Sequence, residues 1–266
     1  MNEVIRPGAE DEDRLDRSRR VGWVDVDRLA RSQVLVVGAG ALGNEVVKNL
    51  VLSGFRHLTL VDMDRVVRSN LNRCLFFNDT DAEGRSFKAE VLARGAAALD
   101  PDVRIEALVC RVEEVDPWVF EQSDLVLGCL DNVAARLHVN AHCCLHGRPL
   151  VDGGTLGTSG KVQVVLPPAG PCLQCAMNRT HYRVLEKRHS CTGVETAFFE
   201  PKMAAEITTT SVIAAIQVRE VLKILSGQRG RCLQHLLHYD GLANRTLELE
   251  VPLDPNCPMH GDRTVA

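Results

Sequence analysis

The chain has 266 residues, of which 45% are hydrophobic and 25% charged, and it carries a formal net charge of −4 at pH 7. This balance predicts a substantial core and excludes global disorder. The negative charge and the 4% of aromatic residues argue against a nucleic-acid-binding protein or one attracted to an anionic membrane. No apolar run approaches the roughly 18 residues of a membrane span, and the N-terminus lacks the apolar core of a signal peptide. We therefore expect a cytoplasmic protein with neither nucleic acid nor membrane as partner.

Strand-like and helix-like segments alternate through the first half of the chain. Residues 1–31 are polar and charged, and they predict a flexible arm that ends in a short helix around 24–30. After the arm, short apolar runs predict buried strands, and apolar residues at helical spacing predict helices between them. This alternation predicts a parallel sheet with right-handed crossovers. The predicted strands cover residues 33–37, 57–61, 103–109, 124–128 and 149–151. One predicted helix ends at Gly54, and two further helices cover 86–99 and 132–145.

The pattern changes after Gly154. A polar, irregular segment over about 178–203 separates one predicted strand from a long helix that is followed by two more strands. We therefore predict a single domain over residues 32–260, with a short tail over 261–266. The predicted strands of this half are 161–166, 234–239 and 245–251, and the long helix covers 204–225.

A glycine-rich turn follows the first predicted strand. Gly38, Gly40 and Gly43 form the pattern G-x-G-x-x-G at the start of a helix. Glycines let the backbone approach a phosphate, and a helix N-terminus offers free N–H groups and a positive partial charge. Asp62, at the end of the second strand, is placed to bind ribose hydroxyls. This pattern predicts nucleotide binding and leaves NAD and ATP both open.

The following polar residues favour ATP. Arg73 and Lys88 offer positive charges that suit a triphosphate better than a nicotinamide, which makes an NAD oxidoreductase the least favoured class. Asp131 follows the fourth predicted strand at its carboxyl end, where such sheets bind ligands. A carboxylate there can hold Mg²⁺ together with phosphate oxygens.

These motifs together resemble the ThiF/MoeB/HesA superfamily of adenylating enzymes. The resemblance rests on VLVVGAGALG, LTLVDMDRVVRSNLNR, GCLDN, LVDGGT, CLQC and NCPMHG. It is strongest toward the catalytic subunits that activate eukaryotic ubiquitin-like proteins. The resemblance implies an α/β fold of Rossmann type, with a parallel N-terminal half and antiparallel C-terminal strands. It also implies ATP-dependent adenylation of the C-terminal carboxylate of a small ubiquitin-like protein.

The resemblance also implies roles for individual residues. Asp62 and Asp64 would bind ribose and shape the nucleotide pocket, and Asp131 would coordinate Mg²⁺. The segment before Lys88 is one residue longer than the family's usual spacing, so its first helical turn departs from the pattern. Phosphate contacts are implied for Asn70, Arg73 and Lys88, and the rest of the pocket for Gly38, Gly40, Ala41, Leu42, Gly43 and Asn132.

The ten cysteines divide into three groups. Cys172, Cys175, Cys257 and His260 form two pairs of ligands, each with two intervening residues, and four such ligands suit a structural, tetrahedral Zn²⁺. Cys191 lies among basic residues that favour a reactive thiolate, and by resemblance it would receive the activated protein as a thioester. We predict packing roles for the other six, which are Cys74, Cys110, Cys129, Cys143, Cys144 and Cys232.

The main hypothesis is therefore adenylation followed by a thioester on Cys191 and transfer to a conjugating-type enzyme. One alternative is a sulfur-carrier protein adenylyltransferase without an essential thioester, and another is a non-catalytic scaffold subunit. Relatives often supply an arginine from the arm of a partner subunit, which suggests a homodimer. The candidates here are Arg17 and Arg20.

Overall fold

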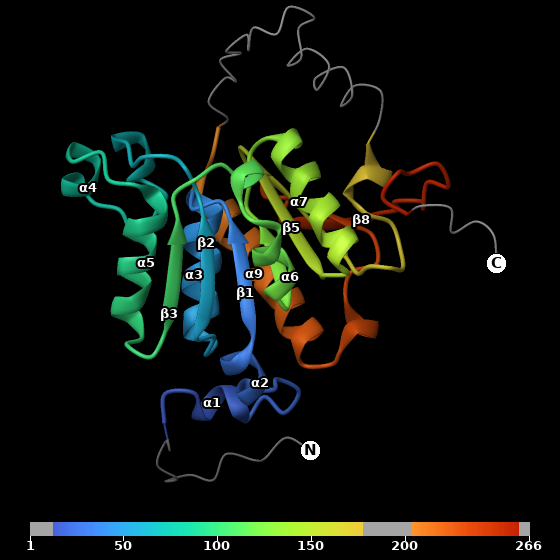
Figure 1. Ribbon diagram of the computed structural model, residues 1–266, viewed down its shortest axis with the longest axis horizontal. Helices are drawn as coiled ribbons and strands as arrows, with labels where there is room; N and C mark the ends of the chain where they lie inside the picture. Colours follow the sequence, from blue (N-terminus) through green and yellow to red (C-terminus); the bar gives the residue numbers. More distant parts are fainter. Residues whose placement is uncertain (1–12, 178–203, 261–266) are drawn as a thin grey trace, which may run out of the picture.

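The computed structural model describes residues 13–177 and 204–260. In this part of the chain, eight strands form one sheet in the order β3-β2-β1-β4-β5-β6-β7-β8 (Figure 1). Neighbours from β3 to β5 are parallel, and neighbours from β5 to β8 are antiparallel, as predicted. The strands are β1 Gln33–Val37, β2 His57–Val61, β3 Arg104–Leu108, β4 Leu125–Gly128, β5 Leu150–Leu156, β6 Ser159–Val165, β7 Leu236–Asp240 and β8 Arg245–Leu249.

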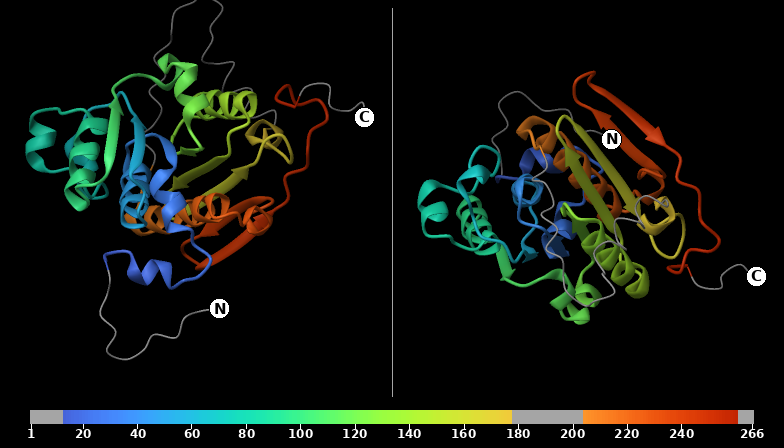
Figure 2. Two further views of the ribbon diagram at one scale, coloured as in Figure 1. Left: turned by 60° about the horizontal axis from the view of Figure 1, so that its bottom comes forward. Right: turned by 90° about the horizontal axis from the view of Figure 1, so that it is seen from above.

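Helices cover both faces of the parallel part of the sheet (Figure 2). On one face α3, α5 and α9 share a hydrophobic cluster with Val34 and Val36 of β1. On the other face α6 and α7 share a second cluster with Leu35 and Val37. This follows from the period-2 alternation of side chains along a strand, and it explains why β1 is apolar on both faces. The helices are α3 Ala41–Leu52, α5 Lys88–Leu99, α6 Pro117–Gln122, α7 Val133–His146 and α9 Ile207–Leu225.

The long helix begins later than predicted because a carboxylate caps it. Glu206 accepts hydrogen bonds from the backbone N–H groups of Thr208 at 2.7 Å and Thr209 at 2.8 Å. Such a cap satisfies donors that have no partner within the first helical turn. The fifth strand is longer than predicted because residues 152–156 pair with β6 in a hairpin. None of the described helices has the length and apolarity needed to cross a membrane.

Two short helices, α1 Asp16–Arg19 and α2 Val26–Arg31, pack at the amino ends of the strands (Figure 1). Arg14 forms an ion pair with Asp100 at 2.9 Å, and the backbone N–H of Asp25 donates to Ser226 Oγ at 3.0 Å. These contacts hold the described part of the arm at the amino ends of the strands, whereas Asp131 follows the carboxyl end of β4. The short helices α4 Asp79–Glu83 and α6 were not predicted.

Candidate active site

The predicted nucleotide residues converge at the carboxyl ends of β1, β2 and β4. The strand order places β2 and β4 on opposite sides of β1, so the connections leave β1 in opposite directions. This is the switch point at which open α/β sheets bind ligands. The glycine turn follows β1, Asp62 follows β2 and Asp131 lies three residues beyond β4.

Packing within the protein requires two of the three glycines. A Cβ on Gly38, whose φ is +103°, would lie 2.5 Å from the backbone oxygen of Cys129, and a Cβ on Gly43 would lie 2.0 Å from that of Gly38. A Cβ on Gly40 would meet nothing within 4 Å. The missing side chain of Gly40 therefore leaves open space at the N-terminus of α3, where a bound phosphate fits.

Asp62 fixes the glycine turn to the end of β2. Its Oδ2 accepts a hydrogen bond from the backbone N–H of Ala39 at 2.7 Å, and its Oδ1 accepts one from that of Asp64, also at 2.7 Å. Burial raises the pKa of Asp62, while the positive charge of Lys88 and these two donors oppose the rise. The carboxylate thus orients the turn, and its predicted ribose contact stays a prediction.

Lys88 is held beside the two carboxylates by the first turn of α5. Its Nζ lies 2.6 Å from Asp64 Oδ2, and its backbone N–H donates to Asp64 O at 2.9 Å. Burial alone would lower the pKa of Lys88, but the charges of Asp62 and Asp64 outweigh it and raise the pKa. The two carboxylates thus offset the positive charge of Lys88 beside the glycine turn, and its predicted phosphate contact stays a prediction.

The segment with Asn70 and Arg73 forms a tight turn that packs against α3. Asn70 is buried, and its Oδ1 accepts the backbone N–H of Val67 at 3.1 Å. Arg73 donates to the backbone oxygen of Ser69 and to Asn72 Oδ1. Both side chains thus take part in bonds within the turn, and their predicted phosphate contacts stay predictions. Asn44 joins this turn to the glycine turn by accepting from Phe76 N and donating to the backbone oxygen of Ala39.

The Asp131 loop begins beside the glycine turn. Its exposed carboxylate makes no hydrogen bond or ion pair within residues 13–177 and 204–260, so it is open to a cation. The next residue, Asn132, is the N-cap of α7, and its Oδ1 accepts the backbone N–H of Ala135 at 2.8 Å.

A buried ion pair that was not predicted from the sequence holds the Asp131 loop in place. Arg136 of α7 donates to the carboxylate of Asp152 and also to the backbone oxygen of Leu130. The side chains of Arg136 and Asp152 are only 12% and 5% exposed. Arg136 therefore fixes the residue directly before Asp131. From the opposite face of the sheet, the amide of Gln217 donates to the backbone oxygens of Gly128 and Val151.

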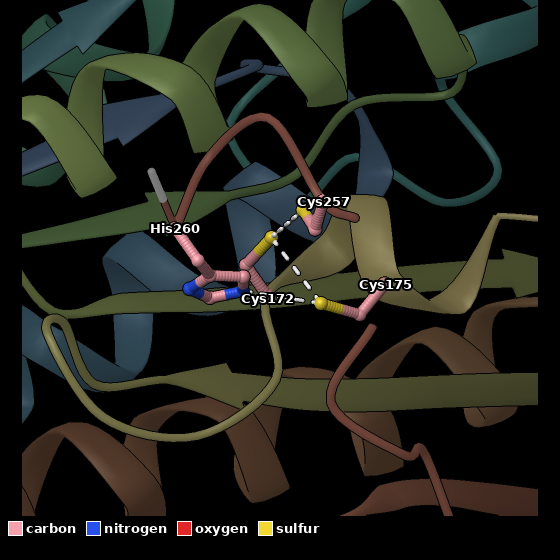
Figure 3. Close-up of side chains that lie close together, drawn as sticks. All are labelled: Cys172, Cys175, Cys257 and His260. Atoms are coloured by element: carbon pink, nitrogen blue, oxygen red, sulfur yellow. Dashed lines mark hydrogen bonds between the residues drawn. The ribbon is translucent and has the colours of Figure 1, made fainter. Parts of the chain in front are cut away.

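The four proposed metal ligands come together as predicted (Figure 3). Cys172 Sγ lies 3.9 Å from Cys175 Sγ and 3.7 Å from Cys257 Sγ, and Cys175 Sγ lies 3.1 Å from His260 Nε2. Metal–sulfur bonds of about 2.3 Å give a tetrahedron with sulfur–sulfur edges of about 3.8 Å. The donor set and its spacing thus fit one tetrahedral metal ion that joins the turn after β6 to residues 257–260.

The packing cysteines are mostly buried. Burial raises the pKa of the Cys74 and Cys232 thiols to about 11, and it also raises the pKa of Cys110, Cys129 and Cys143. Cys110 and Cys144 are half-exposed, which the prediction of buried packing residues did not anticipate.

The described contacts do not test the predictions for Cys191 and for the arginines of the arm. Cys191 and the crossover segment lie outside the described residues. Of the arm's arginines, Arg20 forms an ion pair with Asp16 at 2.8 Å. The predicted contact of Arg17 or Arg20 with a partner subunit stays a prediction.

Comparison with known proteins shows which family contains this arrangement. The chain is 34% identical to the sulfur carrier protein adenylyltransferase of Thermus thermophilus over 260 residues, which is 93% of this chain and 91% of the relative. It is 33% identical to the NEDD8-activating enzyme E1 catalytic subunit of Caenorhabditis elegans over 61% of this chain and 42% of that protein. The chain thus spans less than half of that E1 subunit.

Solved structures share the fold at low sequence identity. A crystal structure of E. coli MccB with ATP superimposes with a TM-score of 0.74, covers 96% of this chain and 77% of MccB, and is 18% identical. The model of the ThiF family matches residues 14–259. With nearly the whole described chain inside that match, the protein belongs to the ThiF family.

Proposed function

We propose that this protein uses ATP and Mg²⁺ to adenylate the C-terminal carboxylate of a small ubiquitin-like sulfur-carrier protein. The observation that carries the proposal is the near full-length match to a sulfur carrier protein adenylyltransferase. The E1 catalytic subunits match only part of this chain and less than half of their own length. The sulfur-carrier alternative is therefore better supported than the conjugation hypothesis favoured by the motifs. As a ThiF-family member, the chain is an adenylyltransferase.

The chain's own groups supply the electrostatics of this reaction. The glycine turn and the N-terminus of α3 would hold the phosphates, with Arg73 and Lys88 offsetting their charge. The open carboxylate of Asp131 would hold Mg²⁺, which polarises the phosphate oxygens when bound. The substrate carboxylate then attacks the α-phosphorus, a new P–O bond forms, and the bond to pyrophosphate breaks. Positioning and charge neutralisation supply most of the rate enhancement in such a step.

The test is ATP–pyrophosphate exchange with candidate ubiquitin-like proteins. We expect exchange that requires both Mg²⁺ and a free C-terminal carboxylate on the partner, and thiocarboxylate formation when sulfide is added. A protein that supports no exchange with any carboxylate-bearing partner would instead be a scaffold subunit, and the proposal would fail.

A second candidate function is suggested by the partial match to E1 catalytic subunits. In this candidate, the activated protein is transferred to Cys191 as a thioester and then to a conjugating-type enzyme. We expect Cys191→Ala to leave pyrophosphate exchange intact in either case. A reducible adduct on a non-reducing gel that Cys191→Ala abolishes would establish the thioester step.

Two of the described cysteines, Cys74 and Cys232, are poor competitors for Cys191 in this gel assay. Cys74 and Cys232 have thiol pKa values of about 11, so neither forms much thiolate near neutral pH. Cys232→Ala is the matched control, because it removes a thiol of this group. An adduct that survives Cys191→Ala would exclude Cys191 as its site.

We also propose that the Cys172, Cys175, Cys257 and His260 cluster binds structural Zn²⁺. All four positions would be filled by protein ligands, which leaves no open position for catalysis. We expect about one zinc per chain by metal analysis, and loss of that zinc in Cys172→Ser with a lower Tm. Cys143→Ala, another buried cysteine, should keep the zinc. A parent protein without zinc would contradict this proposal.

The described part of the arm is compatible with a homodimer in which an arginine reaches the partner's site. Within one chain, α1 packs at the amino ends of the strands (Figure 1), whereas Asp131 follows the carboxyl end of β4. Arg17 and Arg20, which belong to the described part of the arm, would therefore contribute to catalysis only in another subunit's site.

A further inference from the structure

Lys161 of β6 stands out among the charged residues near the Asp131 loop. Arg136 and Asp152 neutralise each other as a buried pair. Lys161 is exposed on the sheet, and its ammonium group forms no hydrogen bond or ion pair within the described ranges 13–177 and 204–260. The three groups together therefore carry one net positive charge.

The register of the hairpin places Lys161 on the same face as Arg136. Lys161 lies directly opposite Gly154 in the β5–β6 pair, and opposed residues of an antiparallel pair project to the same face. A Cβ on Gly154 would lie 2.5 Å from a guanidinium nitrogen of Arg136, which identifies that face. On the other face, Cβ atoms on Gly153 and Gly160 would meet Gln217 and Ile213 of α9.

The charge of Lys161 is shaped by these neighbours. The protein around its ammonium group and the positive charge of Arg136 lower the pKa of Lys161, while Asp152 opposes this shift. The surrounding protein removes part of the water that hydrates the ammonium group. A carboxylate that approached the group would be attracted by its charge and would compensate for this lost hydration. The guanidinium of Arg136 takes up the space over Gly154, so a second positive charge lies beside Lys161.

The order of the strands separates this charge from the nucleotide residues. The glycine turn and Asp62 follow β1 and β2, Asp131 follows β4, and Lys161 lies on β6. Lys161 is therefore three strand spacings, or roughly 14 Å, from β1 and two, or roughly 10 Å, from β4. An anion at Lys161 would lie on the side of Asp131 that faces away from the glycine turn.

We propose that Lys161 binds the C-terminal carboxylate of the protein substrate and guides it toward the Asp131 loop. This inference rests on the proposed adenylation. The substrate carboxylate and ATP are both anions, and they must meet in that reaction beside the further negative charge of Asp131. A cation on the substrate side offsets part of this repulsion.

The test compares two forms of one probe, the sulfur carrier protein of Thermus thermophilus with a free C-terminal carboxylate or with a C-terminal amide. Fluorescence anisotropy measures the Kd of each form for the parent protein and for Lys161→Gln. We expect the parent to bind the carboxylate form about tenfold more tightly, as for a charge-assisted hydrogen bond. Lys161→Gln should bind both forms equally, and Lys161→Arg should restore the preference.

Arg104→Gln is the matched control, because it removes one positive charge from β3, at the other edge of the sheet. It should keep the parent's preference. A parent that does not distinguish the two forms, or Lys161→Gln that still does, overturns the assignment. The affinity for ATP without the probe should be unchanged in Lys161→Gln, and a weakened ATP affinity would assign Lys161 to phosphate instead.

The same proteins separate this inference from the proposed function. A parent that prefers the carboxylate form but supports no pyrophosphate exchange would refute adenylation and leave the carboxylate site standing. Exchange with an unchanged carboxylate preference in Lys161→Gln would refute only the role of Lys161.

Discussion

Replacing Arg136 by methionine is expected to lower the free energy of unfolding by about 3–5 kcal/mol, the cost of breaking a buried ion pair from one side. The variant would leave the carboxylate of Asp152, which is 5% exposed, without its partner. It would also remove the donor that the backbone oxygen of Leu130 accepts from. Urea unfolding monitored by circular dichroism measures the change.

The matched control is Arg68→Met. Arg68 pairs with Glu83 at 3.0 Å, but the two side chains are 74% and 64% exposed. The expected cost is at most about 1 kcal/mol. Adding Asp152→Asn to Arg136→Met should recover part of the lost stability, because it removes the unpaired charge. Equal costs for Arg136→Met and Arg68→Met would contradict the importance of the buried pair.

The second large effect is expected on activity and not on stability. Asp131→Asn should reduce kcat/KM for pyrophosphate exchange by about a hundredfold to a thousandfold, the usual loss when one electrostatic contact to the reacting groups is removed. The Tm should stay within experimental error, because the Asp131 carboxylate is exposed and has no bonding partner in the described structure. The Mg²⁺ concentration needed for half-maximal exchange should rise.

Asp27→Asn is the control for Asp131→Asn. Asp27 is also an exposed aspartate, but it lies in α2 at the amino edge of the sheet. Its replacement should leave the rate of exchange unchanged. A parent-like rate in Asp131→Asn would remove this carboxylate from the proposed mechanism.

The features that the sequence predicted well depend on neighbouring residues. A short apolar run predicts each of β1 and β2, and the glycines that follow the first run predict the turn after β1. The structure places both strands at the predicted residues. The four metal ligands were also predictable, because two Cys/His pairs with two intervening residues each are typical of zinc sites. Their convergence in space is confirmed.

The features that the sequence did not predict depend on contacts across the chain. Arg136 lies within the predicted helix over 132–145, and its partner Asp152 lies on β5. Periodicity cannot indicate which distant carboxylate an arginine will meet. Asn132 was predicted as a nucleotide ligand, and its side-chain oxygen is used as a helix cap. Both roles suit an asparagine at the end of a strand, so residue type alone does not separate them.

The position of the metal ligands along the chain has a consequence for the unfolded state. Cys172 and Cys257 are 85 residues apart, so a metal bound by both closes a loop that contains α9, β7 and β8. By chain-entropy arguments, a metal that stays bound to both cysteines in the unfolded chain closes a loop of 85 residues and restricts that chain by about 4–5 kcal/mol. Removing the metal would therefore stabilise the denatured ensemble even if the native contacts persisted. The metal would then stabilise the C-terminal third of the protein by restricting the conformations of its unfolded chain.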